Sequence, residues 1–122
     1  MEKIVQEYIS KPNLGFEFTY EQRGEAAVFR CSGALSLGSY PDLKVLIPAI
    51  VKTKGKTLVL DMREVAHIDS AGIGTIATIF KEAQAAGREF RIVPSTPVRL
   101  ALGLAKIDTL IRLDDSVESA LS

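Results

Sequence analysis

The chain has 122 residues, of which 47% are hydrophobic and 25% are charged, a composition typical of one globular domain. Its 15 basic and 15 acidic side chains balance, so we expect neither nucleic-acid binding nor attraction to an anionic membrane. One cysteine excludes an intramolecular disulfide, no apolar segment is long enough to cross a bilayer, and residues 1–7 lack the apolar core of a signal peptide. These features predict a soluble cytoplasmic protein.

The N-terminal part of the chain divides at a helix-breaking cluster, Ser10-Lys11-Pro12-Asn13. We expect residues 1–14 to form a separate arm, either a short helix or a disordered tail, and residues 15–122 to form the domain. Apolar and polar side chains alternate over residues 16–20, which predicts a half-buried strand. Residues 26–31 predict a second strand, antiparallel to the first.

The middle of the chain predicts a helix followed by a buried strand. After a loop at residues 32–38, a helix is expected over residues 39–53, kinked or split at Pro48 because proline removes a backbone hydrogen bond. The apolar run Leu58–Met62 suits a central strand covered on both faces. A polar loop over residues 63–69 then leads to a second helix.

This second helix carries Ser70 in its first turn, and its later residues separate into two faces. The residues expected to pack, at spacings of three and four, are Ile73, Ile76, Ala77, Phe80 and Ala83. The residues expected to face water are Thr75, Thr78, Lys81 and Glu82.

The C-terminal part predicts a strand at residues 89–93, a helix that Thr96 caps, and a short strand at residues 109–113. Asp115 and Glu118 have capping-box spacing and predict the start of a last helix. Strands that alternate with helices indicate right-handed crossovers between parallel strands. We therefore predict an α/β fold, a single domain with a mixed, mostly parallel sheet of four to five strands, an N-terminal antiparallel hairpin and about four helices.

Ser70 lies at a helix start, where four backbone amides lack intrahelical partners and the helix dipole is positive. On spacing alone, Asp69 or Ser70 is the N-cap of this helix. The position also suits a hydroxyl that carries a phosphate, because the exposed amides of residues 71–74 can receive it. Gly72 and Gly74 have two interpretations as well: close packing against the sheet, or a bare backbone that a kinase can approach.

Two stretches, Val59–Met62 and His67–Gly74, resemble the signature of STAS domains, and within that family the bacterial anti-sigma factor antagonists, also called anti-anti-sigma factors. The resemblance extends from about Phe16 to the end of the chain. It implies the STAS fold and identifies Ser70 as the serine that a partner kinase phosphorylates. The loop before the first helix departs from the family's Gly-Glu-Leu-Asp, because Ala34 and Ser36 replace the two acids that help to present the serine.

The resemblance also implies a partner. Unphosphorylated, the protein would bind an anti-sigma factor that is a serine kinase and so release a sigma factor, and phosphorylation of Ser70 would end that interaction. ATP and magnesium would belong to the kinase, so no cofactor is expected on this chain. The expected partner-binding residues are Ser36, Ser39, Asp69, Ser70, Ala71, Gly72, Ile73, Gly74, Thr75 and Thr78.

Other chemistry fits the sequence poorly. The spacing of Gly72, Gly74 and Ala77 matches a dinucleotide fingerprint, but residues 63–69 separate it from the preceding strand, which a Rossmann turn does not allow. His67 is the only possible base for a Ser70 nucleophile, and the Gly-x-Ser-x-Gly elbow is missing. One histidine and one cysteine make no metal cluster. We do not expect an enzyme.

Three alternatives stay open at this point. The chain could be a STAS scaffold in a stressosome-like complex or an accessory subunit of a lipid transporter, without a phosphorylation switch. It could also be a small-molecule or nucleotide-binding module. The N-terminal arm, residues 1–14, could contact a partner or a second copy in a homodimer, or it could be inert.

Overall fold

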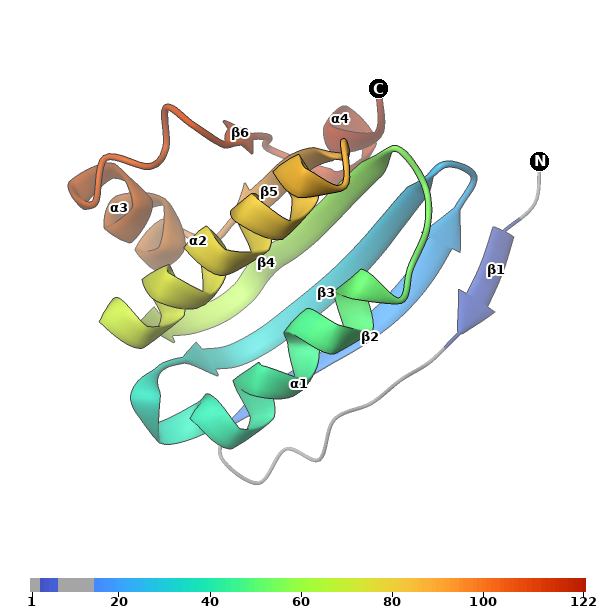
Figure 1. The fold of residues 1–122 in the computed structure, drawn as a ribbon. Helices are drawn as coiled ribbons and strands as arrows, with labels where there is room; N and C mark the ends of the chain where they lie inside the picture. Colours follow the sequence, from blue (N-terminus) through green and yellow to red (C-terminus); the bar gives the residue numbers. More distant parts are fainter. Residues whose placement is uncertain (1–2, 7–14) are drawn as a thin grey trace.

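The computed structural model describes residues 3–6 and 15–122, which form one sheet with helices around it (Figure 1). The strands are β1 (Lys3–Gln6), β2 (Phe16–Arg23), β3 (Ala26–Leu35), β4 (Thr57–Ile68), β5 (Glu89–Pro94) and β6 (Arg112–Leu113). The helices are the 3-10 turn η1 (Leu37–Ser39), α1 (Tyr40–Val51), α2 (Ser70–Ala85), α3 (Thr96–Leu104) and α4 (Val117–Leu121). Within the described residues, no helix is both long and apolar enough to span a bilayer.

The order of the strands in the sheet follows their order in the chain, from β1 to β6. The first three strands are antiparallel, and β3 to β6 are parallel. This arrangement confirms the predicted α/β fold with its hairpin, β2 and β3. The expectation of a helix or a disordered tail is wrong for residues 3–6, which add an edge strand beside β2. Residues 7–14 of the predicted arm lie outside the described residues.

Alternate side chains of the central strands enter two different cores, because successive residues of a strand point to opposite faces. One set packs beneath α1, α2 and α3, and it includes Phe29, Leu58, Leu60, Phe90 and Ile92. The other set packs beneath α4, and it includes Val28, Val59 and Val93 together with Val117 and Ala120. The sheet is therefore covered on both sides at its centre, as the apolar run in β4 predicts.

Strands β3 and β4 both continue beyond the ends predicted for them. Residues 63–68, expected as a loop, pair with residues 32–35, also expected as a loop. The pairing shifts twice, and at each shift β4 has one residue more than β3. The first extra residue lies between the pairs Arg30–Asp61 and Ser32–Glu64. The second lies between the pairs Gly33–Val65 and Ala34–His67. These bulges break the two-residue alternation by which a strand is recognised in a sequence. The extension carries the two strands side by side to the starts of η1 and α2.

Several helix boundaries differ by one residue from those predicted. Ser95 caps α3 in place of Thr96, and Ser116 caps α4 in place of Asp115. Helix α1 is continuous from Tyr40 to Val51, so Pro48 does not split it. The side chain of Pro48 is exposed, where the ring meets solvent and not the core.

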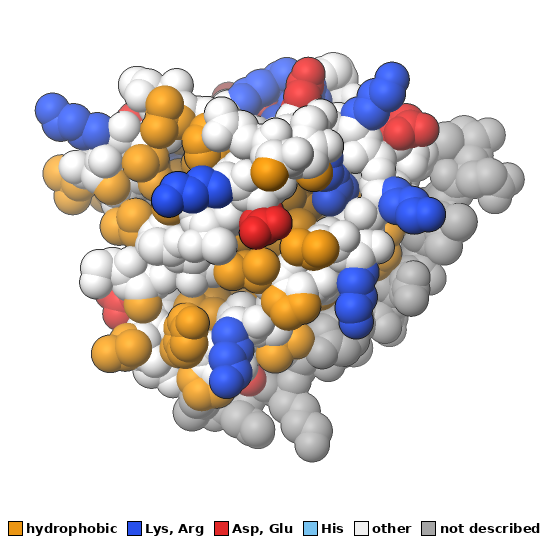
Figure 2. All heavy atoms as spheres, viewed as in Figure 1, with side chains coloured by type: hydrophobic (Ala, Val, Ile, Leu, Met, Phe, Trp, Pro, Cys, Tyr) orange, Lys and Arg blue, Asp and Glu red, His pale blue; other side chains and the backbone are white. Residues whose placement is uncertain are grey.

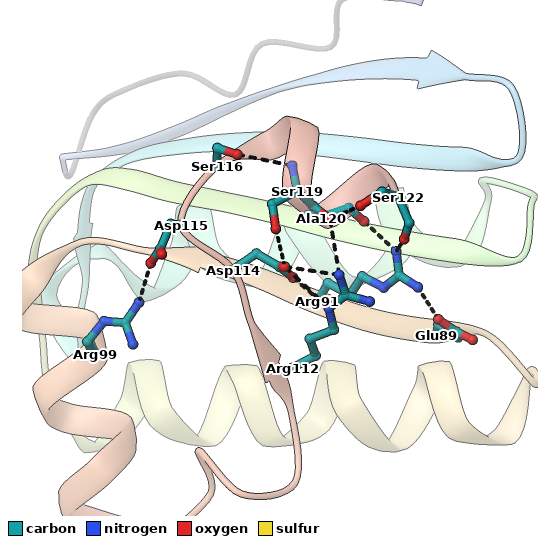
Figure 3. A network of polar contacts seen from close by, with 10 residues as sticks. All are labelled: Glu89, Arg91, Arg99, Arg112, Asp114, Asp115, Ser116, Ser119, Ala120 and Ser122. Atoms are coloured by element: carbon teal, nitrogen blue, oxygen red, sulfur yellow. Dashed lines mark hydrogen bonds and ion pairs between the residues drawn. The ribbon is translucent and has the colours of Figure 1, made fainter.

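Helix α4 is fastened to the sheet by a network of polar contacts on the side opposite α2 (Figure 3). The buried guanidinium of Arg91 in β5 donates to the carbonyl oxygen of Ala120 at 2.5 Å and to that of Ser122 at 3.1 Å. Arg91 also forms an ion pair with Glu89. Arg112 of β6 adds a hydrogen bond to the carbonyl oxygen of Ser119 at 3.1 Å.

Candidate functional site at the start of helix α2

The structure brings together the two segments that the sequence singles out, the loop after β3 and the start of α2. The amide of Asp69 donates to the carbonyl oxygen of Leu35 at 3.1 Å. In return, the amide of Leu37 donates to the Oδ2 atom of Asp69 at 3.1 Å. These segments are more than 30 residues apart in the chain, and the paired ends of β3 and β4 place them side by side.

Asp69, and not Ser70, is the N-cap of α2. Its Oδ1 atom accepts hydrogen bonds from the amides of Ala71 at 2.9 Å and Gly72 at 3.3 Å. The amide of Ile73 donates to the carbonyl oxygen of Asp69 at 3.0 Å, as in a regular first turn. The expectation that these amides are open to a phosphate is therefore wrong, because the cap already occupies them.

The carboxylate of Asp69 is stabilised in its charged form. Hydrogen bonds to a carboxylate lower its pKa. Here the amide of Leu37 makes the largest contribution to lowering the pKa of Asp69, and the amides of Gly72 and Ala71 add to it. Desolvation by neighbouring atoms opposes part of the effect.

Ser70 is the first residue of α2, and its side chain is exposed. Among residues 3–6 and 15–122, no hydrogen bond involves its hydroxyl. A serine that neither caps the helix nor packs into a core contributes little to the fold. Its hydroxyl is free to meet an enzyme or a partner.

The two glycines after Ser70 occupy different environments. A Cβ atom on Gly72 would lie 2.3 Å from the carbonyl oxygen of Leu35 and 2.9 Å from Cγ1 of Ile68. A Cβ atom on Gly74 would have no neighbour within 4 Å among the atoms considered. Gly72 is therefore required for close packing against the sheet. The backbone at Gly74 is exposed.

The remaining predicted contact residues divide by exposure. Ser39 is fully buried, and its hydroxyl donates to the carbonyl oxygen of Ala34 at 2.5 Å. It therefore stabilises the loop and is not exposed to a partner. Thr75 is also buried, against the expectation that it faces water, and its hydroxyl donates to the carbonyl oxygen of Ala71 at 2.9 Å. Ser36 and Ile73 are half-buried, and Thr78 is exposed.

A groove of about 560 Å³ runs between α1 and α2 beside Ser70, and we call it the α1–α2 groove. It is lined by Leu37, Tyr40, Leu43, Lys44, Ile47 and Pro48 on one wall and by Ala71, Gly74, Thr75 and Thr78 on the other. Figure 2 shows hydrophobic side chains over the part of this face where α1 lies, with lysine or arginine side chains among them.

The first wall of the α1–α2 groove contains Leu37, in the loop expected to contact a partner, and Tyr40, neither of which is among the contact residues named from the sequence. Leu37 is 72% exposed and Tyr40 is 46% exposed, so two large hydrophobic side chains of this wall are open to solvent. A sequence signal existed for Leu37, which is an apolar residue in the loop predicted at residues 32–38. Among the described residues that line the groove, Lys44 is the only charged one.

The other polar residues considered in the sequence lie elsewhere. Asp61 is buried on the α4 side of β4, where it accepts hydrogen bonds from the Arg63 side chain at 2.8 and 2.9 Å and from the Arg63 amide at 3.2 Å. His67 is exposed near the end of β4. Cys31 is buried, and burial raises the pKa of its thiol. Within the described residues, no group of three or more histidine, cysteine or acidic side chains is placed to hold a metal ion.

Comparison with known proteins identifies the family. The family model of the STAS domain matches residues 17–120. This chain therefore belongs to the STAS domain family.

Three solved structures share the fold. An anti-sigma factor antagonist from Mycobacterium paratuberculosis superimposes with a TM-score of 0.79 at 24% identity, over 92% of this chain and 95% of that one. A sulfate transporter family protein from Wolinella succinogenes gives 0.69 at 19% identity, over 81% and 84%. The Bacillus cell fate determinant SpoIIAA in its phosphorylated form gives 0.62 at 18% identity, over 83% and 94%.

Proposed function

We propose that this protein is an anti-sigma factor antagonist whose docking to an anti-sigma factor is ended by phosphorylation of Ser70. The observation that carries the proposal is the position of Ser70. Its side chain is exposed and has no structural role, and the next residue, Ala71, lines the α1–α2 groove. The family and the likeness to an anti-sigma factor antagonist and to a phosphorylated SpoIIAA support it. Because one fold serves unrelated functions, a transporter family protein included, the site carries more weight than the fold.

The α1–α2 groove indicates the chemistry of the partner. Leu37 and Tyr40 offer apolar surface that a partner would remove from water, at about 25 cal/mol per Å² buried. Lys44 supplies a positive charge to the lining and favours an acidic group opposite it. We infer that the anti-sigma factor presents an apolar segment with at least one aspartate or glutamate to this face.

A phosphate on Ser70 would oppose such docking through its charge. It adds about −1.5 to −2 charges beside the carboxylate of Asp69. A partner that covers this end of the groove must desolvate that charge or supply a cation. Leaving a charge buried without a partner costs roughly 3–5 kcal/mol, which lowers the affinity by at least a hundredfold.

In this proposal the chain has no catalytic activity of its own. The anti-sigma factor is the serine kinase, and it brings ATP and magnesium to the complex. The protein acts in the cytoplasm, where the transcription machinery is located, and it needs neither nucleic acid nor membrane insertion.

The proposal is tested by incubating the purified chain with a serine-kinase anti-sigma factor and Mg-ATP and then mapping the phosphate. Trypsin releases residues 64–81 as one peptide, because no lysine or arginine lies between Arg63 and Lys81. Fragment ions then separate Ser70 from Thr75 and Thr78, the other hydroxyls of that peptide. We expect one phosphate, on Ser70, and none on the Ser70→Ala variant.

Binding completes the test. Ser70→Ala should bind the anti-sigma factor as tightly as the unmodified protein, whereas the phosphorylated protein should bind at least a hundredfold more weakly. A phosphate on Thr75 or Thr78 alone would refute the assignment of Ser70. Equal affinity with and without phosphate on Ser70 would refute the switch and favour a scaffold role.

A further inference from the structure

A second pocket, of about 360 Å³, lies between the sheet and α1, and we call it the β2–α1 pocket. The rings of Tyr20 in β2 and Phe29 in β3 line one side of it. Val45, Pro48 and Ala49 of α1 line the other side. Pockets that bind small molecules have volumes of about 300–1,000 Å³ and mostly apolar walls. The β2–α1 pocket therefore has the size and the lining of a ligand site, and α1 separates it from the α1–α2 groove.

The aromatic side of this pocket is held in place by its neighbours. The ring of Tyr20 stacks on that of Phe29, with centroids 5.0 Å apart, and Phe29 is buried. The hydroxyl of Tyr20 donates to the side-chain oxygen of Gln22. The amide group of Gln22 in turn donates to the carbonyl oxygen of Lys54 at 3.1 Å. Because these contacts fix the aromatic wall before a ligand arrives, binding costs little ordering of side chains.

The mouth of the β2–α1 pocket is basic. Lys52 lines the pocket, and Lys54 and Lys56 follow it in the loop between α1 and β4; all three side chains are exposed. Figure 2 shows lysine or arginine side chains at the end of α1 where this loop begins. Within the part of the chain that the structure describes, no ion pair involves the three lysines. Glu25 lies near the loop, because its carbonyl oxygen accepts from the amide of Thr57 at 3.1 Å, and it offsets one of the three charges. The remaining positive charge favours a negative group at the mouth.

The C-terminal end of α1 does not reverse this charge. Unpaired carbonyl oxygens at the end of a helix favour a cation. Here the guanidinium of Arg88 donates to the carbonyl oxygens of Gly55 at 2.9 Å and Ile50 at 3.4 Å. The hydroxyl of Thr53 also donates to the carbonyl oxygen of Ile50, at 2.7 Å. These oxygens are paired within the protein, and the ammonium group of Lys52 remains for a ligand.

We propose that the β2–α1 pocket binds a small amphipathic carboxylate, whose apolar tail lies between Tyr20 and Ala49 and whose carboxylate lies beside Lys52. An apolar tail suits the walls, and one negative charge suits the lysine that lines the pocket. A phosphate suits the pocket less well, because phosphate sites provide arginines or the amides of a helix start. Among the described residues that line the pocket, none is an arginine, and α1 contributes its C-terminal half. The site does not depend on Ser70 or on its phosphorylation.

The proposal is tested with decanoate, an unbranched carboxylate that combines an apolar tail with one charge. Titration of the full chain, followed by NMR of the backbone amides, should give saturable shifts at Ala49, Lys52 and Thr53. Octanoate, which is two methylenes shorter, should bind about tenfold more weakly. Decylamine keeps the tail and reverses the charge, so it should bind about fivefold or more weakly still than decanoate, because the lysines repel it. Acetate, which has no tail, should give no saturable shifts.

Two pairs of variants locate the site. Ala49→Phe fills the pocket and should abolish decanoate binding, whereas Ala85→Phe, at an exposed alanine of α2, should leave binding unchanged. Lys52→Gln removes the charge at the mouth and should weaken binding by about two- to fivefold, the effect of one exposed ion pair. Lys81→Gln removes an exposed lysine of α2 and should have no effect. Because Lys52 is exposed, Lys52→Gln keeps the test valid even if Ala49→Phe does not fold.

The opposite results would overturn the proposal. If decanoate gives no saturable shifts, the pocket does not bind this class of ligand. Shifts at Leu37, Ala71 and Gly74 in place of Ala49 would put the ligand in the α1–α2 groove. Equal affinity for decanoate and decylamine, or equal affinity of Lys52→Gln and the unmodified protein, would show that the lysines do not select a carboxylate. These experiments use neither the kinase nor the anti-sigma factor, so their outcome is independent of the proposed function.

Discussion

The Cα atom of Gly72 lies so close to the end of β3 that a Cβ atom there would approach the carbonyl oxygen of Leu35 to 2.3 Å and its Cβ atom to 2.7 Å. Contacts this short with backbone atoms are relieved only by moving the helix or the strand. The start of α2 therefore sits against β3 at a distance that glycine alone permits, and this distance positions Asp69 and Ser70.

Alanine substitutions at the two glycines should have opposite effects on stability. Gly72→Ala forces the backbones apart, and we expect it to lower the free energy of unfolding by about 1–3 kcal/mol. Gly74→Ala adds a methyl group in open space and improves helix propensity, so it should raise that free energy by about 0.5–1 kcal/mol. Urea denaturation followed by circular dichroism measures both. Equal effects of the two substitutions would contradict the close approach at Gly72.

The stability of the protein should depend on the charge of Asp69 in acid. Its pKa is lower in the folded protein than its ordinary value of 3.8. The contribution of its carboxylate is therefore complete above that value and is lost as the pH falls through the folded pKa. We expect the difference in urea midpoint between the unmodified protein and Asp69→Asn to be constant from about pH 5 to 7 and to shrink below pH 4. A difference that persists unchanged in acid would show that the charge is not involved.

Arg91 should be needed to hold α4 on the sheet. Lysine in its place keeps the charge but cannot direct two donors to the carbonyl oxygens of Ala120 and Ser122. We expect Arg91→Lys to cost about 1.5–3 kcal/mol and to accelerate hydrogen exchange at the amide of Ala120. Arg99→Lys is the matched control, because Arg99 forms an ion pair with the exposed side chain of Asp115 outside α4, and it should cost less than about 1 kcal/mol. Equal exchange at Ala120 in both variants would remove Arg91 from this role.

Cys31 should be inert in the folded protein. Its side chain is buried in the main core, and burial, together with the nearby charge of Asp61, raises the pKa of the thiol. Because the thiolate is the reactive form, a disulfide reagent such as Ellman's reagent should react only as fast as the protein opens. We expect slow reaction without denaturant, complete reaction in urea and an intermediate rate for Arg91→Lys. Prompt, complete reaction of the folded protein would contradict the burial of this residue.

The fold was predictable from the sequence where the apolar pattern is regular. The run Leu58–Met62 predicts a covered central strand, and alternation over residues 16–20 predicts the hairpin. The extension of β4 was not predictable by alternation, because the two bulges opposite β3 put successive apolar residues such as Val65 and Ile68 out of phase. Residues 3–6 form a strand through pairing with β2, a tertiary contact that leaves no periodic signal in four residues.

The position of the candidate site was predictable from the sequence, but its cap residue and its hydrogen bonds were not. The spacing of Asp69, Ser70 and the glycines marks a helix start, but serine, threonine and aspartate cap helices almost equally well, so the sequence cannot choose among neighbouring residues. For the same reason, the caps predicted for α3 and α4 differ by one residue from those in the structure. The contact between Asp69 and Leu37 joins residues 32 positions apart, and only the folded chain reveals it.

The α1–α2 groove and the polar network that holds α4 lie on opposite sides of the sheet. The residues of the α1–α2 groove, with Asp69 and Ser70, come from one continuous stretch, 36–78, whereas the network of Arg91 and α4 lies on the opposite side and is built from later residues. Substitutions on one side therefore leave the contacts of the other in place. A change in the exposed side chains of α1 and α2 therefore alters the surface offered to a partner, while the contacts that hold α4 on the sheet stay intact.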